Sequence, residues 1–227
     1  MTMNITSPAK KLARRLLGSS YDRLKSTVQR TAYRARLWKL PSPVKLHLGC
    51  GNRHLDGFVN IDLLSGVADV LADRTCLTFI RSDTVSHILV EHMLEHLGRS
   101  QAQAALREWS RVLKPGGVLE IEVPDVIWCL ENFLAAPAAE RYRVAYEDKG
   151  AIASIYGLQT NPGQFHKFGY TPEHLSECVS ACGLEVIDVK LHMTYHPCRS
   201  IRIWGRKKES SFNGSTYAEA GHIVLHS

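Results

Sequence analysis

From Val44 onward, short apolar runs alternate with turns and with stretches of helical periodicity. Such alternation is typical of βαβ units, whose strands form a parallel sheet. The pattern predicts one α/β domain with a doubly wound sheet of about seven strands. The predicted strands lie near residues 44–48, 58–62, 69–71, 85–90, 118–123, 184–193 and 200–204, and the clearest predicted helices lie near residues 100–113 and 172–182.

Charge divides the chain into two unlike parts. Residues 1–45 hold eleven Lys or Arg residues against one acid, Asp22, a net charge of +10. The remainder holds 17 basic and 21 acidic residues, a net charge of −4. The sequence pI of about 9.0 therefore comes from the N-terminal segment. A mildly acidic body argues against nucleic acid as a partner, because a phosphate-binding groove needs clustered Lys and Arg.

Residues 1–42 form a basic amphipathic arm in this interpretation, with one or two helices that end before Pro43. A single domain is expected over residues 43–207, followed by a C-terminal tail over residues 208–227. The arm fits several roles: a solvated arm or packed helix, a helix at an anionic membrane surface, a contact with a partner or nucleic acid, or a transit peptide.

No apolar run of 18 residues and no secretory signal occur, so a cytoplasmic protein is expected, with peripheral contact at the cytoplasmic membrane as one alternative.

A glycine-containing loop, Gly49-Cys50-Gly51, follows the first predicted strand. Glycine at such a turn exposes backbone N–H groups to a ligand. Asp62 closes the next apolar run, where a carboxylate can accept both hydroxyls of a ribose. A dinucleotide site would place a third glycine where Arg53 or His54 stands, and that glycine lets a helix approach a pyrophosphate. The spacing therefore favours a nucleoside without phosphates, of which S-adenosylmethionine (SAM) is one.

Four segments carry a family resemblance: KLHLGCGNRHLDGFVNIDL, ADVLAD, VEHMLEHL and RVLKPGGVLEIEVPD. Between about Val44 and Gly205 the chain resembles the class I SAM-dependent methyltransferases of the type 11 group, in particular a bacterial branch associated with polysaccharide biosynthesis. The LKPGG segment, after LEHL and before an apolar strand, is the most specific part. The resemblance implies a Rossmann-like, mostly parallel sheet whose last strand is antiparallel, with SAM as the cofactor.

The resemblance also implies a set of site residues. Gly49 and Gly51 match the loop under the methionine part of SAM, Asp62 matches the acid on the ribose hydroxyls, and Asp73 matches the polar residue near the adenine amino group. The cofactor-binding residues expected on this basis are His47, Gly49, Cys50, Gly51, Asp62 and Asp73, and the catalytic candidates are Glu91, His92 and His166. Three positions depart from the family pattern, in which Asp is usual at His47, Gly at Arg53 and Asp at Ser86.

Two metal-like patterns occur. His92, Glu95 and His96 match the H-x-x-E-H signature of zinc proteases, but they follow a predicted buried strand and precede LKPGG, where the methyltransferase pattern expects LEHL for packing. Cys178 and Cys182 share one face of a predicted helix, and no second pair of ligands lies nearby. The six cysteines include no C-x-x-C pair. The sequence therefore predicts reduced thiols and no metal.

Methyl transfer from SAM is an in-line displacement in which positioning is the main task of the protein. The resemblance implies O-methylation of a sugar or glycan intermediate, with a small molecule or glycan as acceptor. His166, His92 or Glu91 would then take the hydroxyl proton. The departures at His47, Arg53 and Ser86 support an alternative, a catalytically inactive SAM-binding scaffold that recruits partners.

Overall fold

The computed structural model describes residues 43–63, 66–142, 151–159, 162–193 and 199–209. The basic arm at residues 1–42 and the tail from residue 210 lie outside the described residues, so their predicted roles stay predictions. Within the described residues, no helix is long and apolar enough to cross a membrane.

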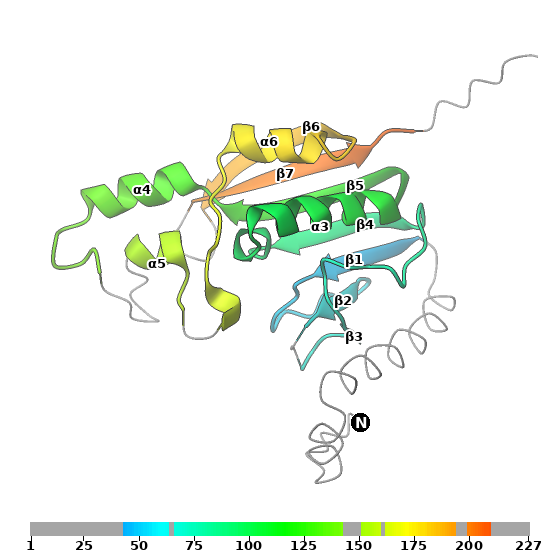
Figure 1. The fold of residues 1–227 in the computed structure, drawn as a ribbon, viewed down its shortest axis with the longest axis horizontal. Helices are drawn as coiled ribbons and strands as arrows, with labels where there is room; N and C mark the ends of the chain where they lie inside the picture. The colour runs from blue at the N-terminus through cyan, green and yellow to red at the C-terminus, as the bar shows by residue number, and fades with distance from the viewer. Residues whose placement is uncertain (1–42, 64–65, 143–150, 160–161, 194–198, 210–227) are drawn as a thin grey trace, which may run out of the picture.

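Seven strands form one sheet in the order β3-β2-β1-β4-β5-β7-β6 (Figure 1). Strands β1 to β5 pair in parallel, and β7 is antiparallel to both of its neighbours, β5 and β6. The Rossmann-like, mostly parallel sheet is thus confirmed, as are the positions of all seven predicted strands. The strands are β1 (Val44–Leu48), β2 (Val59–Asp62), β3 (Val70–Leu71), β4 (Val85–Glu91), β5 (Leu113–Pro124), β6 (Leu184–Met193) and β7 (Arg199–Lys207).

The two clearest predicted helices are confirmed as α3 and α6, and shorter helices occur around them. The helical segments among the described residues are α3 (Arg99–Val112), α4 (Val126–Ala135), α5 (Ala151–Tyr156), α6 (Pro172–Ser180) and the 3₁₀ turns η1 (Leu94–His96) and η2 (Pro162–Gln164). Thr171 caps α6, because its side chain accepts a hydrogen bond from the His174 N–H at 3.2 Å.

The hydrophobic core lies between the sheet and helices α3 and α6 (Figure 1). Trp109 of α3 is fully buried against this face, together with Ile88 of β4 and Ile121 of β5. Between these apolar positions the strands carry polar residues, such as His87 and Glu120, which hydrogen-bond to each other at 3.0 Å. Strand residues alternate between faces, so one face of the sheet is apolar and the other is largely polar.

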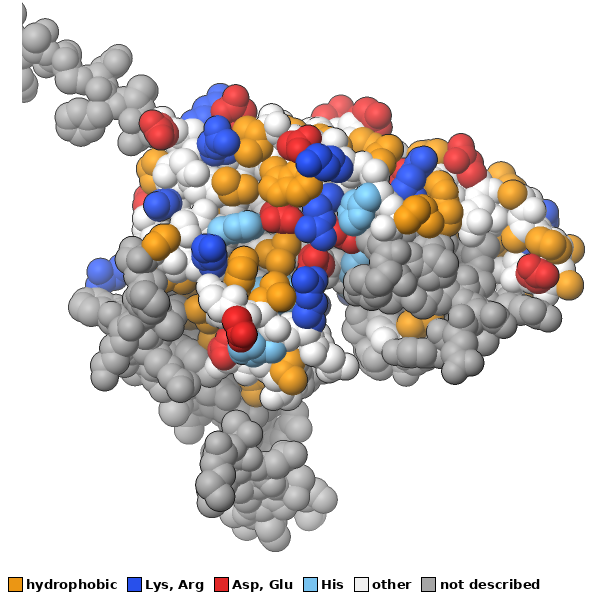
Figure 2. Space-filling view, turned by 180° about the vertical axis from the view of Figure 1, so that it is seen from behind, with side chains coloured by type: hydrophobic (Ala, Val, Ile, Leu, Met, Phe, Trp, Pro, Cys, Tyr) orange, Lys and Arg blue, Asp and Glu red, His pale blue; other side chains and the backbone are white. Residues whose placement is uncertain are grey.

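The polar face is visible from behind the molecule, where acidic, basic and histidine side chains gather among apolar ones (Figure 2). The described residues between β1 and β2 form turns and contain no helix. Parallel strands that are covered on both faces are usually continuous apolar runs. The alternation in β4 and β5 therefore matches a sheet with one apolar and one polar face, and the described residues supply no crossover helix between β1, β2 and β3.

The LKPGG segment makes the tight entry into β5. A Cβ atom added at Gly117 would lie 2.8 Å from the carbonyl oxygen of Lys114 and 3.0 Å from that of Val85. Only glycine fits this approach of the β5 backbone to β4. Gly117 therefore permits the close approach of β5 to β4 at this point, and the far end of β5 carries the acidic residues of the candidate site.

Candidate cofactor and acceptor site

The glycine loop leaves the carboxyl end of β1, the edge at which parallel sheets of this type bind ligands. Gly49 and Gly51 have positive φ angles of 71° and 52°. A Cβ atom at Gly49 would lie 2.7 Å from Cγ of Met93, so this position has no room for a side chain. At Gly51 an added Cβ meets nothing within 4 Å. The loop thus packs closely at Gly49 and faces open space at Gly51, as a cradle for a ligand requires.

Asp62 ends β2 beside this cradle. Its Oδ2 accepts a hydrogen bond from the backbone N–H of Gly51 at 3.1 Å. The structure therefore places Asp62, the residue predicted to bind the ribose hydroxyls, next to the predicted glycine loop. This geometry fits the nucleoside part of SAM. Asp73 lies further along this edge, after β3, where its Oδ1 accepts hydrogen bonds from Thr75 N at 2.9 Å and Oγ1 at 2.7 Å.

His47, near the end of β1, and Cys50, within the glycine loop, are both buried. The His47 side chain is 2% exposed, with Nδ1 3.0 Å from Oδ1 of Asn60 and Nε2 3.8 Å from Oε2 of Glu91. Burial lowers the pKa of His47, which favours the neutral ring. The predicted part of His47 and Cys50 in cofactor binding stays a prediction, and their burial leaves little of either side chain at the surface.

Glu91, at the end of β4, is held between two arginines. Arg202 of β7 donates from an Nη atom to Oε1 of Glu91 at 2.8 Å. Arg53, which occupies the position of the missing third glycine, pairs with Oε2. The Glu91 side chain is 14% exposed, so these contacts are partly shielded from water. Arg53 thereby links the glycine loop to the end of β4.

His92 follows β4 with a φ of 48°. Its Nε2 lies 3.2 Å from Oε1 of Glu122, and its Nδ1 lies 3.5 Å from Oε1 of Glu95. Burial alone would lower the pKa of His92, but the two carboxylates outweigh it and raise this pKa to about 10. In the same cluster the pKa of Glu122 falls to about 2, because hydrogen bonds and charge from His92 and Arg202 outweigh its burial. His92 is therefore a cation at neutral pH, whereas a general base must be neutral.

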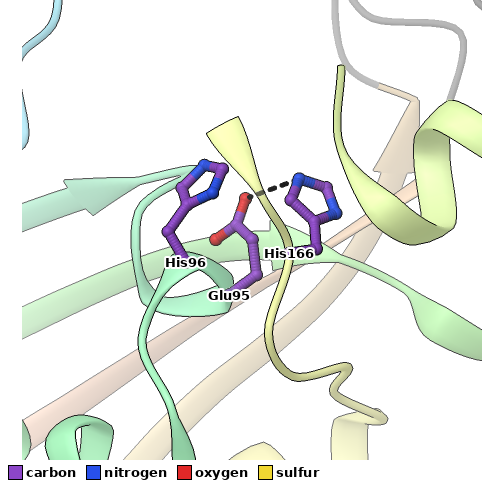
Figure 3. A group of neighbouring side chains, drawn as sticks. All are labelled: Glu95, His96 and His166. Atoms are coloured by element: carbon purple, nitrogen blue, oxygen red, sulfur yellow. Dashed lines mark ion pairs between the residues drawn. The ribbon is translucent and has the colours of Figure 1, made fainter. Parts of the chain in front are cut away.

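Glu95, His96 and His166 form a second cluster next to His92 (Figure 3). Glu95 and His96 lie on η1, and His166 comes from the loop after η2. Nε2 of His166 is 4.0 Å from Oε1 of Glu95, and the two imidazole rings meet edge to face with centroids 5.0 Å apart. Burial lowers the pKa of His166. The structure thus brings one predicted catalytic residue, His166, next to Glu95 and His96 of the EHMLEHL segment.

The H-x-x-E-H segment does not form the α-helix that the zinc-protease signature requires. Only Leu94–His96 is helical, as a single 3₁₀ turn, and His92 precedes it with a positive φ. His92 and His96 therefore do not share one α-helical face.

Asp125 follows β5 and is the N-cap of α4. It is 1% exposed, caps α4 through the N–H groups of Ile127 and Trp128, and accepts a hydrogen bond from Nε of Arg199 at 2.9 Å. These contacts assign Asp125 to the support of the α4 start.

Sequence reasoning missed the central role of Arg202. This residue binds the carboxylates of Glu91, Glu120 and Glu122. The period-2 placement of Glu120 and Glu122 in β5 was the available signal, since two acids on one strand face need a cation. The strand that supplies it lies 80 residues further along the chain.

Comparison with known proteins supports the methyltransferase class that the sequence predicts. A family model described as a methyltransferase domain matches residues 60–121, which run from β2 into β5. Among curated proteins, none matches this chain at a significant level.

Solved structures share the fold at low sequence identity. A SAM-dependent methyltransferase from Methanosarcina mazei aligns with a TM-score of 0.53 and 14% identity over 76% of this chain and 97% of that chain. The 1,6-didemethyltoxoflavin-N1-methyltransferase of Burkholderia thailandensis, solved with 1,6-didemethyltoxoflavin and S-adenosylhomocysteine bound, aligns with a TM-score of 0.50 and 15% identity over 92% of this chain and 94% of that chain. A SAM-dependent methyltransferase from Archaeoglobus fulgidus aligns with a TM-score of 0.50 and 15% identity over 88% and 100% of the two chains.

The chain therefore has the fold of SAM-dependent methyltransferases and a stretch that matches a methyltransferase domain. Together these findings support the class I methyltransferase group, with SAM as the cofactor.

Proposed function

We propose that this chain transfers a methyl group from SAM to a hydroxyl oxygen of a sugar or glycan intermediate. The observation that carries the cofactor half of this proposal is the open cradle at Gly51, with the Asp62 carboxylate hydrogen-bonded to its N–H. The acceptor half rests on the resemblance to the polysaccharide-associated branch. SAM, when bound, would supply an electrophilic methyl group. The acceptor oxygen would gain this methyl group, the sulfur would leave with the electron pair of the broken carbon–sulfur bond, and a base of the chain would take the hydroxyl proton.

The residues of the chain orient the two reactants. In this proposal Gly49 and Gly51 would admit the methionine part of SAM, Asp62 would accept the ribose hydroxyls, and Asp73 would hold the adenine amino group. Positioning of this kind supplies much of the rate enhancement in a bimolecular displacement.

Of the three catalytic candidates, His166 is the one proposed to take the proton of the acceptor hydroxyl. Glu91 is occupied by Arg53 and Arg202. His92 is held between Glu95 and Glu122 as a cation. His166 lies in a loop outside the sheet. Among the described ion pairs, its one carboxylate partner is Glu95, whose Oε1 is 4.0 Å from Nε2 of His166.

Calorimetry with SAM tests the cofactor half. The full-length protein should bind SAM, and Asp62→Ala should weaken binding tenfold or more, which is about 1.4 kcal/mol. Asp56→Ala is the matched control, because the Asp56 side chain is fully exposed in the turn before β2. Absence of SAM binding by the unaltered protein contradicts the proposal.

Incubation with labelled SAM and a panel of nucleotide sugars and glycans tests the acceptor half. We expect label in at least one sugar hydroxyl. Binding of SAM without transfer to any acceptor would instead favour the inactive scaffold.

We also propose that the basic arm, residues 1–42, contacts anionic membrane lipid. Its net positive charge and amphipathic pattern support this, because each Lys or Arg near such a surface contributes about 1 kcal/mol. Full-length protein should sediment with anionic vesicles, and a variant with Lys10, Lys11, Arg14 and Arg15 changed to Gln should sediment less. Equal sedimentation of the two proteins would contradict this role.

A further inference from the structure

Three side chains of types that can bind a metal ion converge outside the cofactor cradle. One donor atom from each of Glu95, His96 and His166 lies within 4.8 Å of the other two. The Glu95 side chain is 2% exposed, and neither of its carboxylate oxygens has a hydrogen-bond partner among the described residues. A buried carboxylate is costly unless a cation or hydrogen-bond donors compensate it. In Figure 3 the carboxylate of Glu95 lies between the two imidazole rings.

The surrounding backbone holds both imidazoles in place. Nδ1 of His96 is 3.0 Å from the carbonyl oxygen of Phe165. A carbonyl can only accept, so Nδ1 carries the hydrogen and Nε2 of the neutral ring keeps a lone pair. His166 hydrogen-bonds to the backbone of Ser154 in α5. Metal-binding histidines usually have such a hydrogen bond from the second ring nitrogen to a carbonyl or carboxylate.

The contact between His92 and Glu95 leaves room at the Glu95 carboxylate for a further partner. Nδ1 of His92 lies 3.5 Å from Oε1 of Glu95, which is longer than the 3.2 Å between Nε2 of His92 and Glu122. His92 is thus shared between two carboxylates, and Glu122 is its closer partner. The Glu95 carboxylate has the capacity to bind a second cation.

We propose that Glu95, His96 and His166 bind a divalent cation of the zinc class, with a further coordination position for water or an acceptor oxygen. Two imidazoles and one carboxylate are the donor set of many catalytic zinc sites. With bonds of 2.0–2.1 Å, the ligands of one tetrahedral zinc ion lie about 3.3 Å apart. Small side-chain rotations bring donors from within 4.8 Å to that spacing, and His166 is carried by a loop.

The SAM site proposed above includes none of these three residues, so the cation site goes beyond it. Its chemical use rests on the proposed function: a cation on the acceptor side lowers the pKa of a bound hydroxyl, as zinc lowers that of water. With the cation bound, His166 would be one of its ligands instead of the residue that takes the hydroxyl proton. Binding of the cation itself does not depend on which acceptor is used.

Cobalt provides a spectroscopic probe for a zinc-class site. Untagged full-length protein is stripped with a chelator and titrated with Co²⁺, with visible absorption as the readout, and then with Zn²⁺ by calorimetry. We expect one equivalent per chain. His96→Ala and His166→Ala should each weaken Co²⁺ binding by at least tenfold, and Glu95→Gln should do the same. His54→Ala is the matched control, because His54 is an exposed histidine beside Asp56 and Asp69 and its loss should change nothing.

The two histidine variants decide the test, since Glu95 is buried and its substitution can disturb folding. Their circular dichroism and SAM affinity should equal those of the unaltered protein. Absence of stoichiometric Co²⁺ binding, or equal binding by both histidine variants and the unaltered protein, overturns the metal site. Intact Co²⁺ binding in a protein that does not bind SAM would overturn the proposed function and leave the metal site standing.

Discussion

Arg202 and Glu122 lie directly opposite each other on the antiparallel strands β7 and β5, and Nε of Arg202 donates to Oε2 of Glu122 at 2.6 Å. The same guanidinium reaches Glu120 of β5 at 2.5 Å and Glu91 of β4 at 2.8 Å. One cation thus joins three strands on the polar face of the sheet. It neutralises carboxylates that would otherwise repel one another next to the cofactor cradle.

Replacement of Arg202 should destabilise the fold strongly. In Arg202→Met the three carboxylates lose their shared partner while Glu122 stays buried, and breaking such a pair costs about 3 kcal/mol of unfolding free energy. Urea denaturation measures this change. Lys190→Met is the control on the neighbouring strand, because Lys190 is 66% exposed and its loss should cost less than about 0.5 kcal/mol. Equal effects of the two substitutions would contradict the central role of Arg202.

Acid should destabilise the protein through Glu122. Its folded-state pKa of about 2 lies below the ordinary value of 4.5, because hydrogen bonds and charge from His92 and Arg202 outweigh the opposing effect of burial. A depressed pKa contributes stability that is present above the unfolded pKa and is lost as the pH falls towards the folded pKa. The loss should therefore begin near pH 4.5 and grow towards pH 2.

Urea midpoints measured between pH 6 and pH 3.5 check this dependence. Glu122→Gln removes the titrating group, so its stability should be lower at pH 6 and should fall less steeply with acid. Parallel curves for the two proteins would show that Glu122 does not carry the effect.

Alanine at Gly51 should weaken SAM binding without a large loss of stability. A side chain with φ of 52° costs about 1 kcal/mol, and the added methyl group would occupy the open space of the cradle. Gly57→Ala is a close control, since Gly57 has a φ of 80° and equally open surroundings in the turn before β2. Both variants should lose similar unfolding free energy, but only Gly51→Ala should lose SAM affinity in calorimetry. Unchanged affinity in Gly51→Ala would place the cofactor elsewhere.

The cap of α6 should contribute measurable stability. Thr171→Ala removes the acceptor for the His174 N–H, which typically costs about 1 kcal/mol. Ser180→Ala, at the exposed end of the same helix, should change the unfolding free energy far less. Thermal or urea unfolding compares the two variants, and a larger loss in Ser180→Ala would refute the capping role.

Features that depend on neighbours along the chain were predictable from the sequence. The strand and helix positions follow from apolar periodicity and from glycine and proline at the turns. The pairing of the Gly51 loop with Asp62 spans eleven residues, and it follows because parallel neighbours β1 and β2 end at the same edge of the sheet. Thr171 could be assigned as a cap because capping needs only the next turn of helix.

The partners of the charged residues were decided by tertiary structure. Arg202 reaches Glu91 across 111 residues of chain, and this requires β7 to insert between β5 and β6, an order that local patterns do not encode. His96 meets the segment of His166 across 69 residues, after the loop behind α5 folds back on η1. Sequence by itself determined the scaffold and the cofactor class, because local backbone preferences and apolar burial suffice for them. The ionisation of His92 and Glu122 and the convergence on Glu95 depend on distances that only the packed sheet sets.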